Sequence, residues 1–319
     1  MKRKSFLIKW ILFITIIIVI PLTFKYLFFL SLEPFLQTGF LVMLSVSLAL
    51  LMGLAGQISL GHAGFFGIGA YTSAILSIKY NMPVLLTIPL GAMMGMIAGF
   101  LVGYPVLRLK THYLSLATLG VGIALKEFFK SAEITGGEIG LYNLPDITIG
   151  NLKLSSSLSH YYIVWGFAIV IIFLGDRLFN SSTGKRLLAI HSDAQSAEAI
   201  GINVFQNKIY IFVLSSGIAA FTGALFAHCS CGAIVPEEFG VMLSIKIIIM
   251  VVIGGMYSVY GAAIGAAIIS LLPEIIRRIG SFTGVDLARL TYIQDIIFGI
   301  ILIIFIIYTP RGIISRKEE

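Results

Sequence analysis

Between two long apolar runs the chain reads Gly53-Leu-Ala-Gly-Gln-Ile-Ser-Leu-Gly-His-Ala-Gly-Phe-Phe-Gly-Ile-Gly-Ala-Tyr-Thr-Ser73. The segment holds six glycines, together with Gln57, Ser59 and His62. Unpaired backbone amides in hydrocarbon cost several kcal/mol each, so lipid does not tolerate a backbone this polar and loosely wound. We therefore predict that the segment faces protein or a water-filled path, which indicates transport.

The composition is that of a membrane protein. Of the 319 residues, 58% are hydrophobic and only 12% are charged, with a mean hydropathy of +1.00. A soluble domain carries about 25% charged residues. Since a helix needs roughly 20 apolar residues to cross the bilayer, we expect an all-α polytopic protein with about ten transmembrane helices. Residues 1–319 are predicted to form a single transmembrane domain.

The apolar runs predict individual spans whose ends are uncertain by several residues. The first run has no small-residue cleavage site and is therefore predicted to be an uncleaved span. The third and eighth runs are short for full crossings, which suits tilted or broken helices. The predicted spans are residues 10–30, 35–53, 64–79, 84–104, 113–129, 161–179, 209–228, 243–256, 259–276 and 291–308.

Basic residues set the expected orientation. With ten crossings, the basic clusters at 2–9, 108–110, 177–208 and 311–317 all fall on one side. The positive-inside rule places that side in the cytoplasm. We therefore expect cytoplasmic termini, a cytoplasmic loop at 180–208 and an external loop at 130–160. The net charge of +7 thus reflects membrane orientation, and nucleic acid is not an expected partner.

The 180–208 loop carries signals for a short, rigid helix. Ser192 or Asp193 offers a hydroxyl or carboxylate cap, with Gln195 following as in a capping box. Gly201 can take the left-handed conformation that ends a helix. Such an element is either a solvated connector or a helix that docks a cytoplasmic motor. The second interpretation gains weight because no Asp, Glu, Lys or Arg lies in the middle of a span, where ion-coupled carriers often keep one.

The sequence offers no sign of catalysis by this chain. A phosphate-binding loop ending at Gly184-Lys185 would need a glycine at position 179, which is Phe179. Cys229 and Cys231 have no metal-ligand spacing around them, and His62 and His112 are each isolated. We expect neither an enzyme nor a metal site, and any ATP would be used by another chain.

Five blocks of sequence, in order and at compatible spacings, cover most of the chain between residues 35 and 312. They are Gly53–Ser77, Leu107–Gly120, Thr135–Leu141, Gly184–Ile190 leading into Ala197–Val204, and Val252–Gly255 continuing through Gly261 to Leu272-Pro273-Glu274. Together these blocks resemble the LivM-type permeases of branched-chain amino-acid ABC importers. The chain departs from many relatives at Thr111-His112, where they have Gly and Asp or Glu.

The resemblance implies an architecture similar to that of vitamin-B12-type importer permeases, in a bacterial or archaeal cytoplasmic membrane. It implies as partners two ABC ATP-binding subunits, a second permease of the LivH type, an extracytoplasmic substrate-binding protein and the lipid bilayer. ATP is then used by the partner subunits, and this chain binds no cofactor. The expected substrates are leucine, isoleucine and valine. Urea, amides or other amino acids stay open, as does a self-contained channel or secondary carrier.

Three groups of residues are candidates for function. Ser192, Asp193, Glu198, Ala199 and Gly201 form the expected ATPase-coupling loop, and three of them, Glu198, Ala199 and Gly201, match the family's docking-helix motif. Gln57, Ser59, Gly61 and His62 either line the translocation path or join helices by close packing and hydrogen bonds. Thr135, Gly136 and Gly137 either contact the binding protein or serve surface turns.

Overall fold

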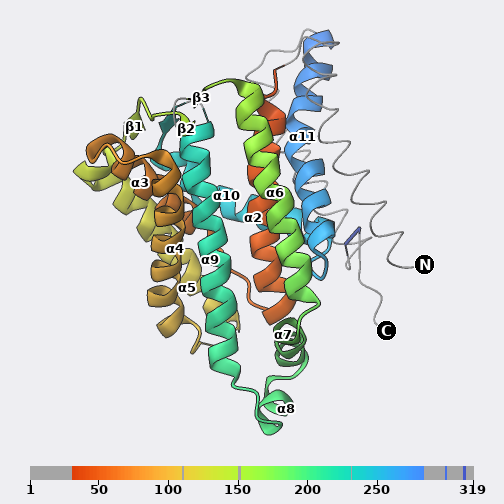
Figure 1. Ribbon diagram of the computed structural model, residues 1–319. Coiled ribbons are helices and arrows are strands. Elements are labelled where there is room, and N and C mark those ends of the chain that lie inside the picture. The colour runs from red at the N-terminus through yellow and green to blue at the C-terminus, as the bar shows by residue number, and fades with distance from the viewer. Residues whose placement is uncertain are drawn as a thin grey trace.

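Long helices make up most of the computed structural model, which describes residues 31–109, 111–149, 152–230, 232–283, 299 and 312–313. The helices are α2 (Glu33–Ala55), α3 (His62–Lys79), α4 (Val84–Val106), α5 (Thr111–Ser131), α6 (Ser157–Phe179), α7 (Ser182–Ser192), α8 (Ala194–Ala199), α9 (Val204–Cys229), α10 (Val241–Gly254) and α11 (Val259–Thr283). Two short 3₁₀ helices are η1 (Glu133–Thr135) and η2 (Pro236–Phe239). The long helices run side by side as a bundle (Figure 1).

The predicted spans between residues 35 and 276 all fall on helices of this bundle. Among the described residues, five helices are long and apolar enough to cross a membrane: α2, α4, α6, α9 and α11, the last over Val259–Arg277. α10 is apolar but has only 14 residues, in line with the short run seen in the sequence. The spans predicted at 10–30 and 291–308 lie outside the described residues, apart from Gly299, and so do both chain ends.

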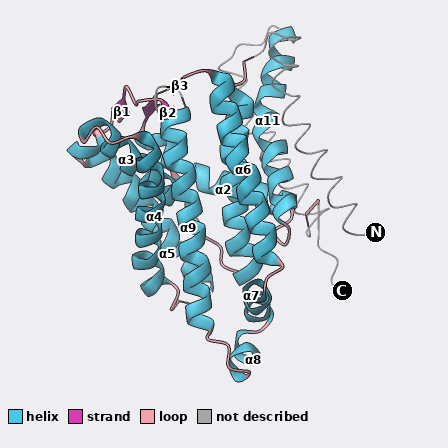
Figure 2. Ribbon diagram, in the orientation of Figure 1, coloured by secondary structure: helices cyan, strands magenta, loops and turns pink. Residues whose placement is uncertain are grey.

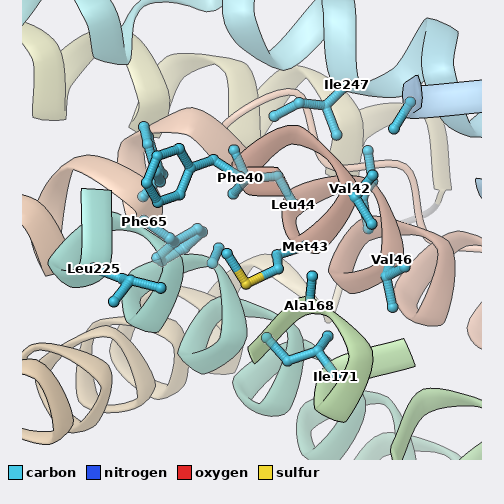
Figure 3. Packing of buried hydrophobic residues seen from close by; sticks show 14 of the residues in the cluster. Phe40, Val42, Met43, Leu44, Val46, Phe65, Ala168, Ile171, Leu225 and Ile247 are labelled. Carbon is cyan, nitrogen blue, oxygen red and sulfur yellow. The ribbon is translucent and has the colours of Figure 1, made fainter. Parts of the chain in front are cut away.

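Helix α2 forms the centre of the bundle. Its apolar window is 94% buried, whereas the corresponding windows of α4, α6 and α11 are 33%, 39% and 39% buried. A helix that is hydrophobic on all sides is expected to be surrounded by protein or lipid. Figure 3 shows Met43 and Leu44 of α2 among Phe65 of α3, Leu225 of α9 and Ile171 of α6. The outer helices therefore pack around α2.

Glycines allow α4 to approach α9 closely. The buried glycines of α4 recur every four residues, at Gly91, Gly95, Gly99 and Gly103. A β-carbon on Gly95 would lie 2.1 Å from the Cβ of Ala220, and one on Gly99 would lie 2.7 Å from the Cβ of Ser216. Small residues at such interfaces bring helix backbones together in membranes, where van der Waals packing drives association. The glycine spacing thus fixes which face of α4 meets α9.

Short strands and short helices mark opposite ends of the bundle. The strands β1 (Leu141–Tyr142) and β4 (Ala233–Ile234) pair antiparallel, as do β2 (Ile147–Ile149) and β3 (Leu152–Leu154). Figure 2 shows these strands at the end opposite α7 and α8. The strands differ from the all-helical fold that the sequence predicts, although the β-branched run Ile147-Thr148-Ile149 favours extended backbone. The 130–160 and 180–208 segments thus lie at opposite ends of the bundle.

Candidate functional site

The segment between α6 and α9 folds into two consecutive helices, α7 and α8. α7 begins at a capped end, where the Ser181 hydroxyl accepts a hydrogen bond from the Gly184 amide at 3.1 Å. Leu187 and Ile190 are buried, so one face of α7 is fixed on the bundle, where the helix packs against α2, α6 and α9. We call residues 182–201 the docking segment, and it extends from the end of the bundle in Figure 1.

The N-terminal cap of α8 is the Asp193 carboxylate. Its Oδ1 accepts a hydrogen bond from the Gln195 amide at 2.9 Å, and its Oδ2 accepts one from the Ser196 hydroxyl. These bonds, above all the one from Ser196, hold the pKa of Asp193 below its usual range. Ser192, the alternative cap in the sequence, is instead the last residue of α7 and donates to the Leu188 carbonyl at 3.1 Å. The predicted short helix is confirmed, and its cap is the carboxylate.

Gly201 ends α8 in the conformation that the sequence predicts. Its φ is +85°, and its amide donates to the Glu198 carbonyl at 2.9 Å. The amide of Ile202 donates to the Ala197 carbonyl at 3.1 Å. This pair of bonds is a Schellman motif, which satisfies the last carbonyls of a helix. Glu198 and Ala199 are exposed on this rigid turn.

A second region, the inner junction, comprises residues 53–62 between α2 and α3. α2 ends at Gly56, whose φ is +65°. The junction is held on α5, because the Leu60 amide donates to the Thr118 hydroxyl at 3.1 Å. Gly61 lies so close to α5 that a β-carbon would be 2.1 Å from the Thr118 carbonyl oxygen. Glycine at position 61 therefore allows the backbones of the inner junction and α5 to approach closely.

The four candidate path residues are brought together in the inner junction, but they differ in bonding. The His62 Nε2 lies 2.6 Å from the Ser47 hydroxyl, so His62 ties α3 to α2. The side-chain oxygens of Gln57 and Ser59 are buried and have no hydrogen-bond partner in the described part of the chain. Such groups are rare in folded proteins and call for an explanation. Ile58, between them, is 38% exposed.

His191 of α7, which is not among the residues that the sequence marks as candidates, connects the docking segment to the inner junction. Its Nδ1 lies 3.2 Å from the carbonyl oxygen of Gly53. Its ring stacks on Tyr257, with centroids 5.7 Å apart and planes at 27°. No second residue at a recognisable spacing marks His191 in the sequence, so its contacts are seen only in the folded chain.

The candidate outer residues shape a tight turn after α5. The Thr135 hydroxyl is buried and donates to the carbonyls of Phe129 and Ala132 at 2.7 and 2.6 Å. Gly136 and Gly137 both have positive φ, at +82° and +64°. Around this turn Glu138 is exposed and Ile139 is 70% exposed. The turn therefore presents acidic and apolar side chains at the end of the bundle that carries the strands.

The described residues contain no group of three or more His, Cys, Asp or Glu side chains that could hold a metal ion. Cys229 is a buried free thiol near the end of α9. An ion pair joins α5 to η2, in which Lys126 contacts Glu237 and holds the pKa of that carboxyl below its usual range.

Comparison with known proteins identifies close sequence relatives among transport permeases. The chain is 27% identical over 306 residues to the high-affinity branched-chain amino acid transport system permease protein LivM of Salmonella typhimurium, covering 88% of this chain and 69% of LivM. It is 23% identical over 292 residues to LivH of the same organism, covering 86% and 91%. It is 24% identical over 281 residues to the fructose import permease protein FruG of Bifidobacterium longum, covering 86% and 80%. No solved structure matches the chain.

The family comparison covers all the described helices of the bundle. The family described as branched-chain amino acid transport system, permease component, matches residues 32–306. That range includes the inner junction, the outer turn and the docking segment. The chain belongs to the family of permease components of branched-chain amino acid transport systems.

Proposed function

We propose that this chain is the membrane permease subunit of an ATP-driven importer of branched-chain amino acids. The observation that carries the proposal is the docking segment, a doubly capped pair of helices at one end of a bundle of apolar helices. Family membership supports the same function. The chain itself is not an enzyme in this proposal, and ATP is used by separate partner subunits.

The docking segment receives the ATP-binding subunits at the cytoplasmic face. Its caps, Asp193 and Gly201, hold α8 rigid, while Glu198 and Ala199 are exposed for contact. Ser192 joins α7 to this turn. A rigid element can transmit a push, whereas a flexible connector absorbs it. The basic residues Lys185 and Arg186 near the start of the segment support its cytoplasmic placement.

The inner junction acts as the closed inner gate of the translocation path. The buried side-chain oxygens of Gln57 and Ser59 lack partners in the described chain, and exposure to water on opening would supply them. Leaving such a group buried costs about 1–3 kcal/mol, so opening would relieve this cost. Gly61 lets the gate pack against α5, and His62 anchors it to α2 through Ser47.

The outer turn at Thr135, Gly136 and Gly137 contacts an extracytoplasmic substrate-binding protein. Support comes from its place at the end opposite the docking segment and from its exposed neighbours Glu138 and Ile139. The 130–160 segment is external in this arrangement. The hydrogen bonds of Thr135 fix the turn, so its backbone would present a constant surface to the partner.

The complete assembly in this proposal has two permeases, two ABC ATP-binding subunits and one binding protein. The likeness of this chain to both LivM and LivH supports a second, related permease as the heterodimer partner. We assign about ten transmembrane helices in one domain over 1–319, arranged as in vitamin-B12-type importer permeases, with both termini cytoplasmic. The location is a bacterial or archaeal cytoplasmic membrane.

The decisive test is co-purification of the tagged chain from native membranes, followed by reconstitution in liposomes. We expect ATP-binding subunits, a second permease and a binding protein to be recovered with it. Leucine should enter the liposomes only with ATP, and isoleucine and valine should compete while fructose and urea do not. ATP-driven entry of fructose, urea or another amino acid alone would overturn the substrate assignment. Leucine entry with this chain alone and no ATP would indicate a channel or carrier.

A further inference from the structure

In the described part of the chain, two turns meet beside the docking segment. The first is the inner junction, and the second is the turn at 255–258 between α10 and α11. A β-carbon on Gly53 would lie 2.0 Å from the carbonyl oxygen of Met256, so the two backbones touch. A movement of one turn therefore displaces the other.

We propose that His191 is a positioning residue that transmits movement of the docking segment to both turns. This inference rests on the proposed function, because it assumes that the docking segment receives a push from ATP-binding subunits. It assigns to one side chain the link between docking and the inner junction. The His191 ring contacts the end of α2 on one side and the second turn on the other.

On one side, the His191 ring is fixed to the end of α2. A carbonyl oxygen only accepts hydrogen bonds, so the Nδ1–H of His191 donates to the Gly53 carbonyl, at 3.2 Å. The ring also lies against Gly56, where a β-carbon would be 2.9 Å from the His191 Cδ2. Gly56 is the residue before Gln57, whose buried oxygen lacks a described partner. A shift of the ring therefore acts directly beside the gate.

On the other side, the ring is stacked on Tyr257 at the centre of the second turn. That turn is itself closely packed, since a β-carbon on Gly254 would lie 2.0 Å from the Gly261 carbonyl oxygen. The amide of Ile313 adds a hydrogen bond to the Ile253 carbonyl at 2.9 Å. The second turn is thus held by close backbone contacts on the flanking residues, and a displacement of it moves the end of α10 and the start of α11.

The anchoring of α7 makes the histidine move with the docking segment. Ile190, the residue before His191, is buried, and so is Leu187 one turn earlier. The docking end is stiffened by the Asp193 cap two residues later. Protein interiors are close-packed, so packed elements shift as units rather than deform continuously. The ring is consequently carried as part of α7 when α8 is pushed.

Three variants separate the two contacts of His191 in the reconstituted importer. His191→Ala removes both contacts, His191→Phe keeps the ring on Tyr257 but removes the hydrogen bond, and Tyr257→Ala removes the stacking. The matched control is His160→Ala, a histidine of α6 at the opposite end of the bundle. The quantity measured is the number of leucine molecules imported per ATP hydrolysed, together with the amount of ATP-binding subunit that co-purifies.

We expect His191→Ala to bind the ATP-binding subunits normally but to import about three- to tenfold less leucine per ATP, the effect of one lost hydrogen bond. His191→Phe and Tyr257→Ala should each show part of this loss, and Tyr257→Phe should recover most of the loss in Tyr257→Ala. His160→Ala should keep the wild-type ratio. A wild-type ratio in both His191→Ala and Tyr257→Ala would overturn the proposal. So would loss of subunit binding in His191→Ala, since that defect is one of docking.

A second readout does not depend on the transported solute. A cysteine at position 58, within the gate, should change its rate of maleimide labelling when a non-hydrolysable ATP analogue binds the partner subunits. With His191→Ala the rate should no longer respond, and with His191→Phe it should respond only in part; a response as large as in wild type in His191→Ala would overturn the proposal. If leucine is not imported but labelling responds through His191, the substrate assignment fails and the transmission role stands. If His191→Ala is not recovered as a folded chain, His191→Phe, which keeps the ring volume, decides.

Discussion

Gly95 of α4 and Ala220 of α9 lie so close that a β-carbon at position 95 would be 2.1 Å from the Cβ of Ala220. Larger residues at such a contact force the helices apart, and overpacking costs about 1–3 kcal/mol. We therefore expect Gly95→Val to lower the thermal unfolding temperature of the purified chain in detergent. Gly120→Ala is the control, because a β-carbon there meets nothing within 4 Å.

A compensating pair tests the same contact from the other side. Gly95→Ala alone should lower the unfolding temperature. Adding Ala220→Gly should restore most of it, because this change removes the Cβ on α9 that the new side chain would meet. If Gly95→Val unfolds at the temperature of the Gly120→Ala protein, the close approach of α4 and α9 is wrong.

A substitution at Gly201 introduces backbone strain without steric overlap. Its φ is +85°, and a β-carbon there would meet nothing within 4 Å, so a side chain causes strain without a clash. A β-branched residue in this conformation costs about 1–2 kcal/mol. We expect less ATP-binding subunit to be recovered with the Gly201→Val chain in a pull-down, and leucine uptake to fall in parallel. Gly201→Asn should be milder, since Asn tolerates the left-handed region, and equal effects of the two variants would argue against strain.

For Asp193, the ionised carboxylate is the capping group. Its pKa is lowered in the folded protein, mainly by the Ser196 hydroxyl. The stabilisation is therefore complete above the ordinary pKa of an aspartate and is lost only as the pH falls through the lowered value. Between about pH 6 and 8, subunit binding should not vary through this group. Asp193→Ala should weaken binding at every pH in that range, measured by titration of the ATP-binding subunit.

The matched variant for this cap is Asp193→Asn, because Asn is also a strong N-terminal capping residue. It should keep most of the binding that Asp193→Ala loses. Equal loss in Asp193→Asn and Asp193→Ala would mean that the charge contacts the partner directly and that capping is secondary.

At the inner junction, Ile58 and Ser59 differ in accessibility, with exposed fractions of 38% and 1%. In a chain without native cysteines, Ile58→Cys should react with a water-soluble maleimide in the resting state and Ser59→Cys should not. During transport with ATP and substrate, position 59 should become reactive if the junction opens as a gate. Protection of positions 57, 59 and 62 under all conditions would instead favour a packing role, and labelling is measured by mass shift.

The apolar helices and the short capped helix α8 were predictable from the sequence because their causes are local. Apolar runs set the helices, and the short-range pattern around Asp193 and Gly201 sets a cap and a left-handed end within a few residues. The Gly53–Ser73 segment likewise predicts a break, since its glycines and polar groups do not suit lipid. The family resemblance was available for the same reason, because its blocks are contiguous.

Contacts between distant segments were decided only by the tertiary structure. The hydrogen bond from His191 to Gly53 joins residues 138 positions apart, and no periodicity in the chain marks either residue for it. The same holds for β1 and β4, which pair Leu141 with Ile234. Hydropathy measures how each residue partitions into lipid, but not which helix face meets which. That choice depends on the close approach of backbones, such as Gly53 on Met256, and such shape fitting exists only once the helices are packed.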